Sequence, residues 1–136
     1  LIPNCPICHQ SLSLAPRELE RVGIATVIMG CARDVVEHCG VPRLLFSDFP
    51  LGNGAGKPHD STSQRQTLEM ALQLLVQAQE PRTTWKSPQV WSDDPTWKLD
   101  YANPERMTPK EFKAAWDEAE KVRIEAKALR TQMLSR

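Results

Sequence analysis

The fold class is decided by one stretch, Ile24-Ala25-Thr26-Val27-Ile28-Met29. It is nearly all apolar and rich in β-branched residues, which indicates a strand buried on both faces. A helical pattern over 14–22 precedes it and is closed by Gly23, a residue that commonly ends helices. A buried strand that follows a helix in this way predicts an α/β domain.

A second helix and a second strand follow within a few residues. The helix is predicted over 32–38 and ends at Cys39-Gly40, and the strand is predicted at Arg43-Leu44-Leu45-Phe46. Strands that alternate with helices through short links are typically parallel and joined by right-handed crossovers. We therefore expect residues 1–80 to form a parallel-sheet, Rossmann-like three-layer domain.

A third helix is predicted from Asp60 or Ser61 to about 79, with Gln64 placed to complete a capping box on Ser61. Apolar residues at helical spacing predict its inward face, which would consist of Leu68, Ala71, Leu72, Leu75 and Ala78.

The remainder of the chain has a different character. Residues 81–107 contain four prolines and are predicted to form an extended arm whose packing anchors are Trp85, Trp91, Trp97 and Tyr101. Thr108-Pro109-Lys110-Glu111 then predicts a helix start, and the long helix would occupy 108–136. Its apolar stripe predicts packing against another subunit, and hence a homo-oligomer; the stripe is Phe112, Ala115, Trp116, Ala119, Val122, Ala126, Leu129 and Met133.

Composition excludes several classes of function. Lys and Arg together number 17, as do Asp and Glu, so no net charge recruits nucleic acid or anionic lipid. No apolar run approaches the roughly 18 residues that a membrane span needs. Four cysteines are too few for a disulfide-stapled mini-protein, which favours a reducing, cytoplasmic environment.

The chemistry concentrates in Asn4-Cys5-Pro6-Ile7-Cys8-His9-Gln10-Ser11. Two cysteines three apart can form a redox pair in which one thiol is the nucleophile and the other resolves the product. We expect them on a loop, with Ser13 as the N-cap of the helix that follows, because Pro16 fits best in a first turn. His9 would orient or protonate a reacting group, or hydrogen-bond the loop.

Two other readings of the cysteines stay open: a structural zinc site and a pair of unreactive thiols. Zinc would take Cys5 and Cys8 with Cys31 and Cys39, or with His9 or His38 as substitutes. The second cysteine pair is separated by seven residues that hold a predicted helix, which is wider than the usual spacing of zinc ligands. We therefore expect no metal.

Residues 51–60 contain Gly52, Gly54 and Gly56 followed by Lys57. The spacing matches neither a Walker A loop nor a dinucleotide fingerprint, and Pro58 stands where a metal-binding hydroxyl belongs. We expect either a mobile loop that closes over a small anionic substrate, with Lys57 supplying charge, or a linker.

Three blocks of the sequence together resemble a known family. They are Cys5-Pro6-Ile7-Cys8-His9-Gln10-Ser11, residues 18–28, and Pro42-Arg43 with Asp48-Phe49-Pro50-Leu51-Gly52 and Ala55-Gly56-Lys57-Pro58. The family is the selenoprotein B group of the glycine, sarcosine, betaine and D-proline reductases, and the resemblance covers residues 4–60 well. It is weaker from there to Tyr101.

The resemblance implies a reductase subunit that cleaves a C–N bond of a small amine. The family's selenocysteine falls at Cys5, which would be the nucleophile; Cys8 would be the resolving thiol and His9 the acid/base or orienting group. The substrate would be framed by Ser11, Gly52, Gly54, Gly56 and Lys57. A thiolate is a weaker nucleophile and leaving group than a selenolate, which implies a slower reaction or a different substrate.

The resemblance also implies partners. A pyruvoyl group on a partner subunit would activate the amine, while this chain itself would carry no cofactor. The partners would be other reductase subunits or the chain's own N-terminal half, since we expect a fragment of a longer protein. The alternatives are an assembly module with structural zinc and a CxxC disulfide oxidoreductase.

Overall fold

The structure is a computed structural model, and it describes residues 1–100, 105 and 107–134. It divides into two compact units, Leu1–Asp94 and Pro95–Arg136. Within the described part, no helix is both long enough and apolar enough to cross a membrane. The predicted anchor Tyr101 lies outside the described residues.

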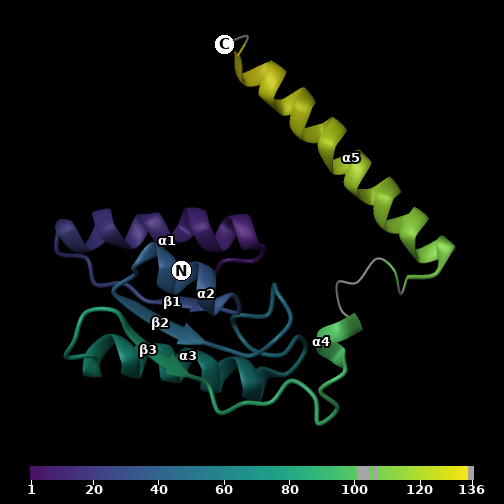
Figure 1. Cartoon of the computed structure of the whole chain (residues 1–136). Helices are drawn as coiled ribbons and strands as arrows, with labels where there is room; N and C mark the ends of the chain where they lie inside the picture. The colour runs from purple at the N-terminus through teal and green to yellow at the C-terminus, as the bar shows by residue number, and fades with distance from the viewer. Residues whose placement is uncertain (101–104, 106, 135–136) are drawn as a thin grey trace. The chain divides into compact units, whose positions relative to one another are not determined.

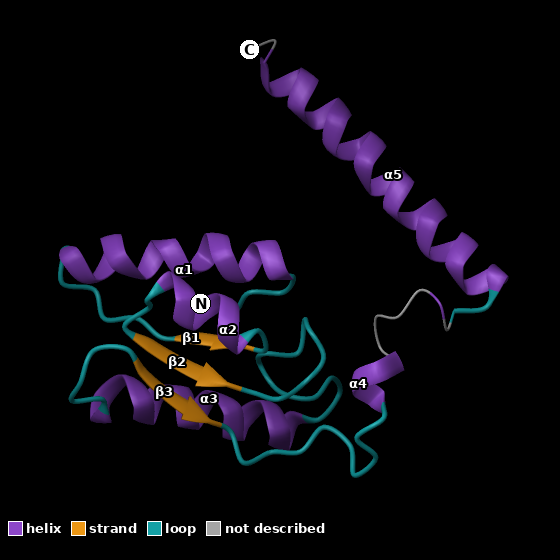
Figure 2. Cartoon of the chain, in the orientation of Figure 1, coloured by secondary structure: helices purple, strands orange, loops and turns teal. Residues whose placement is uncertain are grey.

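Three short parallel strands form the sheet of the first unit (Figure 2): β1 (Ile28–Gly30), β2 (Arg43–Phe46) and β3 (Thr83–Lys86), in the order β1-β2-β3. The prediction of a mixed α/β chain with a parallel sheet is confirmed. The strand at 43–46 has its predicted bounds, whereas β1 covers only the end of the predicted 24–29. β3 was missed, because it falls within the stretch predicted as an extended arm.

β1 begins later than predicted because hydrogen bonds to the helix that precedes it fix the residues just before the strand. Oε1 of Glu20 accepts hydrogen bonds from both the backbone N–H and the hydroxyl of Thr26 and from the guanidinium of Arg43. Ile24 is 53% exposed, so the apolar stretch does not enter the core as a whole. An additional segment runs along the other edge of β1, where the N-terminal amine of Leu1 donates to the Val27 carbonyl and the Leu1 carbonyl accepts from Met29 N–H.

Two helices cover opposite faces of the sheet (Figure 1). α2 (Arg33–Cys39) packs on one face, in a cluster of Ile28, Val36, Val41 and Leu44. α3 (Ser61–Gln77) packs on the other, in a cluster of Met29, Leu45, Ala71 and Leu74. The three parallel strands lie side by side in chain order, and the helices that connect them lie on opposite faces of the sheet. The two crossover connections must therefore have opposite handedness, so only one of them is right-handed. The Rossmann-like three-layer architecture therefore stays a prediction.

The inward face of α3 differs from the predicted stripe. Leu68 and Leu72 are 52% and 54% exposed, and of the five predicted residues only Ala71 is fully buried. Ser63 and Thr67 are buried instead, because their polar atoms have a partner: the side chain of Gln89 bonds both hydroxyls and the Ser63 carbonyl. Asp60 is the N-cap, accepting from Ser63 N–H at 3.0 Å.

The second unit contains α4 (Trp97–Asp100) and α5 (Pro109–Leu134). The predicted helix start is confirmed: the carboxylate of Glu111 accepts from Thr108 N–H at 2.9 Å, and Thr108 Oγ1 accepts from Glu111 N–H at 3.3 Å. Phe112 and Trp116 are exposed and their rings stack, with centroids 6.3 Å apart. Ala119 is exposed as well, and the side chains of the remaining members lie outside the described set, so packing of the stripe against a subunit stays a prediction.

The Gln89 side chain makes three hydrogen bonds to the buried polar groups of α3. Replacing it with Ala (Gln89→Ala) removes these three bonds, and we expect a loss of about 2 kcal/mol in the free energy of unfolding, measured by urea denaturation. Gln73→Ala, at an exposed position of α3, should change the free energy of unfolding by less than about 0.5 kcal/mol. Equal effects from the two variants would show that the network does not stabilise the fold.

Candidate active site

The cysteine motif forms the first turn of a helix, and the prediction that it lies on a loop is wrong. α1 (Pro6–Arg21) has Cys5 as its N-cap. Cys5 Sγ accepts a hydrogen bond from Cys8 N–H at 3.3 Å, the bond that a serine or aspartate oxygen makes at this position. Pro6 favours this start, since proline at the first helical position has no amide hydrogen to satisfy.

The predicted helix start at Ser13 is wrong for a physical reason. Ser13 and Pro16 lie within α1 and are both buried. Proline inside a helix sacrifices one hydrogen bond, and here the helix continues through it with the ring packed in the core. The helix end was predicted correctly: Gly23 has φ +87°, and its N–H bonds the Glu20 carbonyl.

The two thiols of the motif are in direct contact. Cys5 Sγ and Cys8 Sγ are 2.8 Å apart; Cys5 is exposed and Cys8 is half-buried. Hydrogen bonds from the Cys5 side chain, and then from the backbone N–H of Cys5, lower the pKa of the Cys8 thiol. A lowered pKa raises the thiolate fraction of Cys8, and the contact between the two sulfurs allows closure to a disulfide.

His9 is buried and fixes the pair to the sheet. Its Nδ1 lies 2.8 Å from the Cys5 carbonyl oxygen, while Nε2 accepts from the backbone N–H groups of Cys31 at 3.1 Å and Ala32 at 3.3 Å. Since Nε2 is an acceptor from two donors, the ring is neutral and its proton is on Nδ1, donated to the Cys5 carbonyl. Both ring nitrogens are thus engaged in hydrogen bonds, and this geometry supports a role for His9 in positioning Cys5.

Gly30, at the end of β1, leaves room for the imidazole. A Cβ at this position would lie 3.1 Å from Cδ2 and 3.2 Å from Nε2 of His9, closer than ordinary van der Waals contact. The sequence therefore pairs a small residue on β1 with a ring on α1.

Two glycines of the 51–60 loop serve close backbone approach. Gly52 has φ +95°, and a Cβ there would lie 2.5 Å from Oδ1 of Asn4, the residue before Cys5. A Cβ at Gly54 would lie 2.6 Å from the carbonyl oxygen of Met29 on β1. The loop is thus packed between the start of α1 and the end of β1, as a wall beside the thiols.

The third glycine joins the same loop to α3. Gly56 has φ +112°, and a Cβ there would lie 2.7 Å from Cα of Gln64. Lys57 N–H donates to Ser63 Oγ at 2.9 Å, so its backbone is fixed. The structure thus places Gly52 beside Asn4, the residue before Cys5, whereas contact of Gly52, Ser11, Lys57 or the other glycines with a substrate stays a prediction. Ser11 is exposed on the outer side of α1.

Cys31 belongs to this region, although the sequence had suggested it only as a zinc ligand. Its sulfur receives the backbone N–H groups of Phe49 and Asn53, and its amide bonds His9. Burial raises the pKa of the Cys31 thiol to about 11, with the nearby Asp48 carboxylate acting in the same direction. It is therefore a protonated thiol that ties the glycine-containing loop to β1. Asn4 was also missed, and only its place beside Cys5 could have indicated it.

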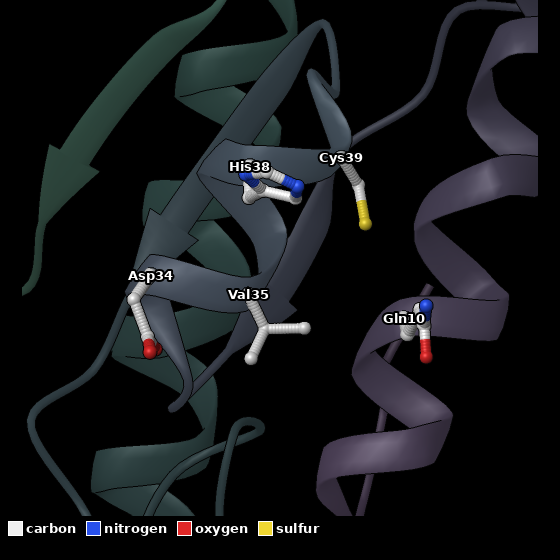
Figure 3. Close-up of a pocket in the computed structure, with 5 residues that line it drawn as sticks. All are labelled: Gln10, Asp34, Val35, His38 and Cys39. Atoms are coloured by element: carbon white, nitrogen blue, oxygen red, sulfur yellow. The ribbon is translucent and has the colours of Figure 1, made fainter.

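Cys39 lies elsewhere. It lines an open groove of about 480 Å³ between α1 and α2 (Figure 3), together with Gln10, Asp34, Val35 and His38. At 100° per residue, Gln10 and Cys8 flank the buried face of α1 on opposite sides, so this groove is on the side away from Cys8. Among the described residues, no three His, Cys, Asp or Glu side chains are grouped so as to hold a metal, which gives the zinc reading no support.

Comparison with known proteins gives one relative to report. The chain is 33% identical over 70 residues to the D-proline reductase subunit gamma of Acetoanaerobium sticklandii, a match that covers 52% of this chain and 29% of the relative. The chain thus spans less than a third of the length of the curated protein that it resembles. No family model and no solved structure matches it.

The opposite pKa shifts within the site predict selective labelling. At pH 7.5, limiting iodoacetamide should alkylate the Cys5–Cys8 pair about 100-fold faster than Cys31, whose thiolate forms only near pH 11. Peptide mapping by mass spectrometry measures both alkylation rates. Raising the pH should bring the rate for Cys31 closer to that for the Cys5–Cys8 pair.

Denaturant provides the control. In guanidinium chloride the thiols should react at similar rates, since the difference comes from the folded environment. Labelling of Cys31 as fast as the pair in the native protein would contradict this site.

Proposed function

We propose that this chain is the dithiol-bearing part of a reductase subunit of the glycine, betaine and D-proline reductase type. The observation that carries the proposal is the contact of Cys5 and Cys8 at the N-cap of α1, with sulfurs 2.8 Å apart and the pKa of Cys8 lowered. The similarity to a D-proline reductase subunit supports the reaction class.

The proposed chemistry uses each sulfur once. A Cys5 thiolate attacks the carbon next to nitrogen, a C–S bond forms, and the C–N bond breaks as the amine takes the electron pair and a proton. Cys8 thiolate then attacks the Cys5 sulfur, which forms the disulfide and breaks the C–S bond; the carbon takes that electron pair and a proton. The substrate gains two electrons and the dithiol loses two.

Cys5 is the proposed nucleophile because it is the more exposed cysteine, and because its thiol donates to Cys8 Sγ, whose lowered pKa lets Cys8 take the Cys5 proton as the bond to carbon forms. Cys8 is the proposed resolving thiol, because it lies one helical turn from Cys5 and its sulfur is in contact with the Cys5 sulfur. His9 holds the turn in place through the Cys5 carbonyl, so its proposed role is positioning rather than proton transfer to substrate.

The packed 51–60 loop beside the Cys5–Cys8 pair is the proposed substrate-binding surface. Gly52 and Asn4 form its near edge, and Ser11 and Lys57 remain candidates for contact with a small amine substrate. The remaining parts of the reaction lie outside this chain: the pyruvoyl group on a partner subunit, which would activate the amine, and the other reductase subunits. No step proposed for these residues depends on the form of that partner.

A second candidate is disulfide exchange with other proteins. The observation that favours it is the segment at Leu1, which pairs alongside β1 and so places an extended stretch directly before Cys5. This is the arrangement from which a CxxC at a helix start acts in disulfide oxidoreductases. It would use the same two sulfurs but no C–N bond cleavage.

Trapping of the intermediate separates the two candidates. With the proposed partner subunits present, Cys8→Ser should stop turnover of the amine and leave the carbon fragment bound to Cys5, visible as a mass adduct on the peptide that contains Cys5. Cys5→Ser should lower turnover at least 1000-fold and leave no adduct, on the order expected for loss of a covalent nucleophile.

Cys39→Ser is the matched control, since Cys39 lines the groove on the other side of α1. It should keep turnover within twofold. Full turnover by Cys5→Ser would contradict the proposed nucleophile. Cleavage of protein disulfides, with no adduct from glycine, sarcosine, betaine or D-proline, would favour the second candidate.

A further inference from the structure

The sequence of α5 contains a seven-residue repeat of apolar positions. Apolar residues recur at alternating spacings of three and four, at Phe112, Ala115, Ala119, Val122, Ala126, Leu129 and Met133. In the heptad notation abcdefg, these residues hold every a and d position of three successive heptads and the first position of a fourth. We name these seven residues the α5 seam. A narrow repeat of this kind is typical of a helix that packs against another helix.

The α5 side chains that the structure describes are open to solvent. None of them is buried, and Glu120 is the only one of them that is half-buried. At the start of the seam, Phe112 stacks on Trp116, which is 65% exposed and holds the neighbouring e position. A helix of 26 residues is about 39 Å long and draws most of its stability from packing on other elements. The seam is therefore available to a second helix.

Charged residues of opposite sign border the two sides of the seam. The g positions hold Glu118 and Glu125, the e positions hold Arg123 and Arg130, and all four side chains are exposed. In a parallel pair of identical helices, a g residue faces the e residue five positions later on the other copy. Parallel packing thus joins Glu118 to Arg123 and Glu125 to Arg130 of the other copy. Antiparallel packing places g beside g and e beside e, which opposes like charges.

The ion pairs within α5 compete only weakly with these contacts. A carboxylate oxygen of Glu118 lies 3.8 Å from the Lys121 ammonium, and the Arg123 guanidinium donates to Glu120 at 2.8 Å. Exposed ion pairs contribute little to stability, so Glu118 can exchange its partner at low cost. A guanidinium has five N–H donors, which allows Arg123 to keep Glu120 and to bind a second carboxylate.

We infer that the α5 seam is the interface of a parallel, two-stranded coiled coil formed with a second copy of this chain. The occupant is a second copy because the charges beside the seam complement those of an identical, parallel helix at both matched pairs. The inference fixes the orientation and register of the pair, which the apolar stripe alone left open. Because residues 1–94 precede α5 in the chain, a parallel pair joins both dithiol-bearing units to the same end of the coiled coil.

Sedimentation velocity of the full chain tests the charge pairing. We expect the wild-type chain to show a monomer–dimer equilibrium. The double variant Glu118→Arg, Glu125→Arg should weaken the dimer at least about tenfold, because arginines then face arginines. Arg123→Glu, Arg130→Glu should weaken it to a similar extent. An equimolar mixture of the two double variants should restore a mixed dimer, since opposite charges again face each other.

Lys113→Glu, Lys127→Glu is the matched control for the second double variant. It changes the net charge by the same amount, but at b positions, which lie away from the seam. It should change the dissociation constant of the dimer less than about threefold, since exposed charges outside the interface interact weakly.

An introduced thiol tests the orientation. Ala119→Cys replaces an a residue, and equivalent a residues of two copies lie side by side only in a parallel coiled coil. Mild oxidation should therefore link two copies of this variant through position 119, and peptide mapping distinguishes that disulfide from products of the native cysteines. Ala114→Cys, at an outward c position, should form the corresponding link at least about tenfold less.

Four results would overturn the inference. They are a wild-type chain that stays monomeric up to millimolar concentration, a trimer, a dimer that neither charge reversal weakens, and a dimer whose Ala119→Cys form does not cross-link. The first would assign the seam to a different partner, and the last would show antiparallel packing. None of these results bears on the dithiol chemistry, which is tested separately at Cys5 and Cys8.

Discussion

The imidazole of His9 holds the site together. It is fully buried, donates from Nδ1 to the Cys5 carbonyl, and accepts at Nε2 from two backbone amides of the turn after β1. A helix start is otherwise free to fray, because its first amides have no partners within the helix. With His9 in place, the N-cap cysteine is anchored to the carboxyl end of the sheet, and the two sulfurs meet at a defined position. A buried ring with both nitrogens bonded is costly to disturb, which makes it a firm anchor.

The sheet contributes through its carboxyl edge. In parallel α/β sheets the loops at this edge carry the chemistry, and here the loop after β2 is packed against Asn4, β1 and α3 through three glycines. Cys31 reinforces the same edge by accepting amides of that loop. The loop is packed closely at these glycines, since each permits an approach that a side chain would block, and its closing over a substrate stays a prediction. A reactive pair on rigid supports needs little reorganisation when it reacts.

Sequence patterns predicted the local elements whose signals are local. The strand at 43–46, the helix end at Gly23 and the capping box of α5 each depend on a few neighbouring residues, and each was found. The misses depend on distant partners. Buried Ser63 and Thr67 look like surface residues until Gln89 bonds them, and a proline within α1 looks like a helix start until Cys5 is seen to cap the helix earlier. The reactive pair could be named from its spacing, whereas the role of His9 required its contacts with the turn after β1.

The central claim is that His9 is a neutral ring with its proton on Nδ1, fixing Cys5 to the sheet. Nitrogen-15 NMR of the full chain with labelled histidine measures this directly, with the exposed His59 as an internal reference. The account predicts a single Nδ1–H tautomer for His9, with Nε2 unprotonated, in both the dithiol and the disulfide forms. A proton on Nε2, or a ring that averages between tautomers as a solvated histidine does, would contradict it.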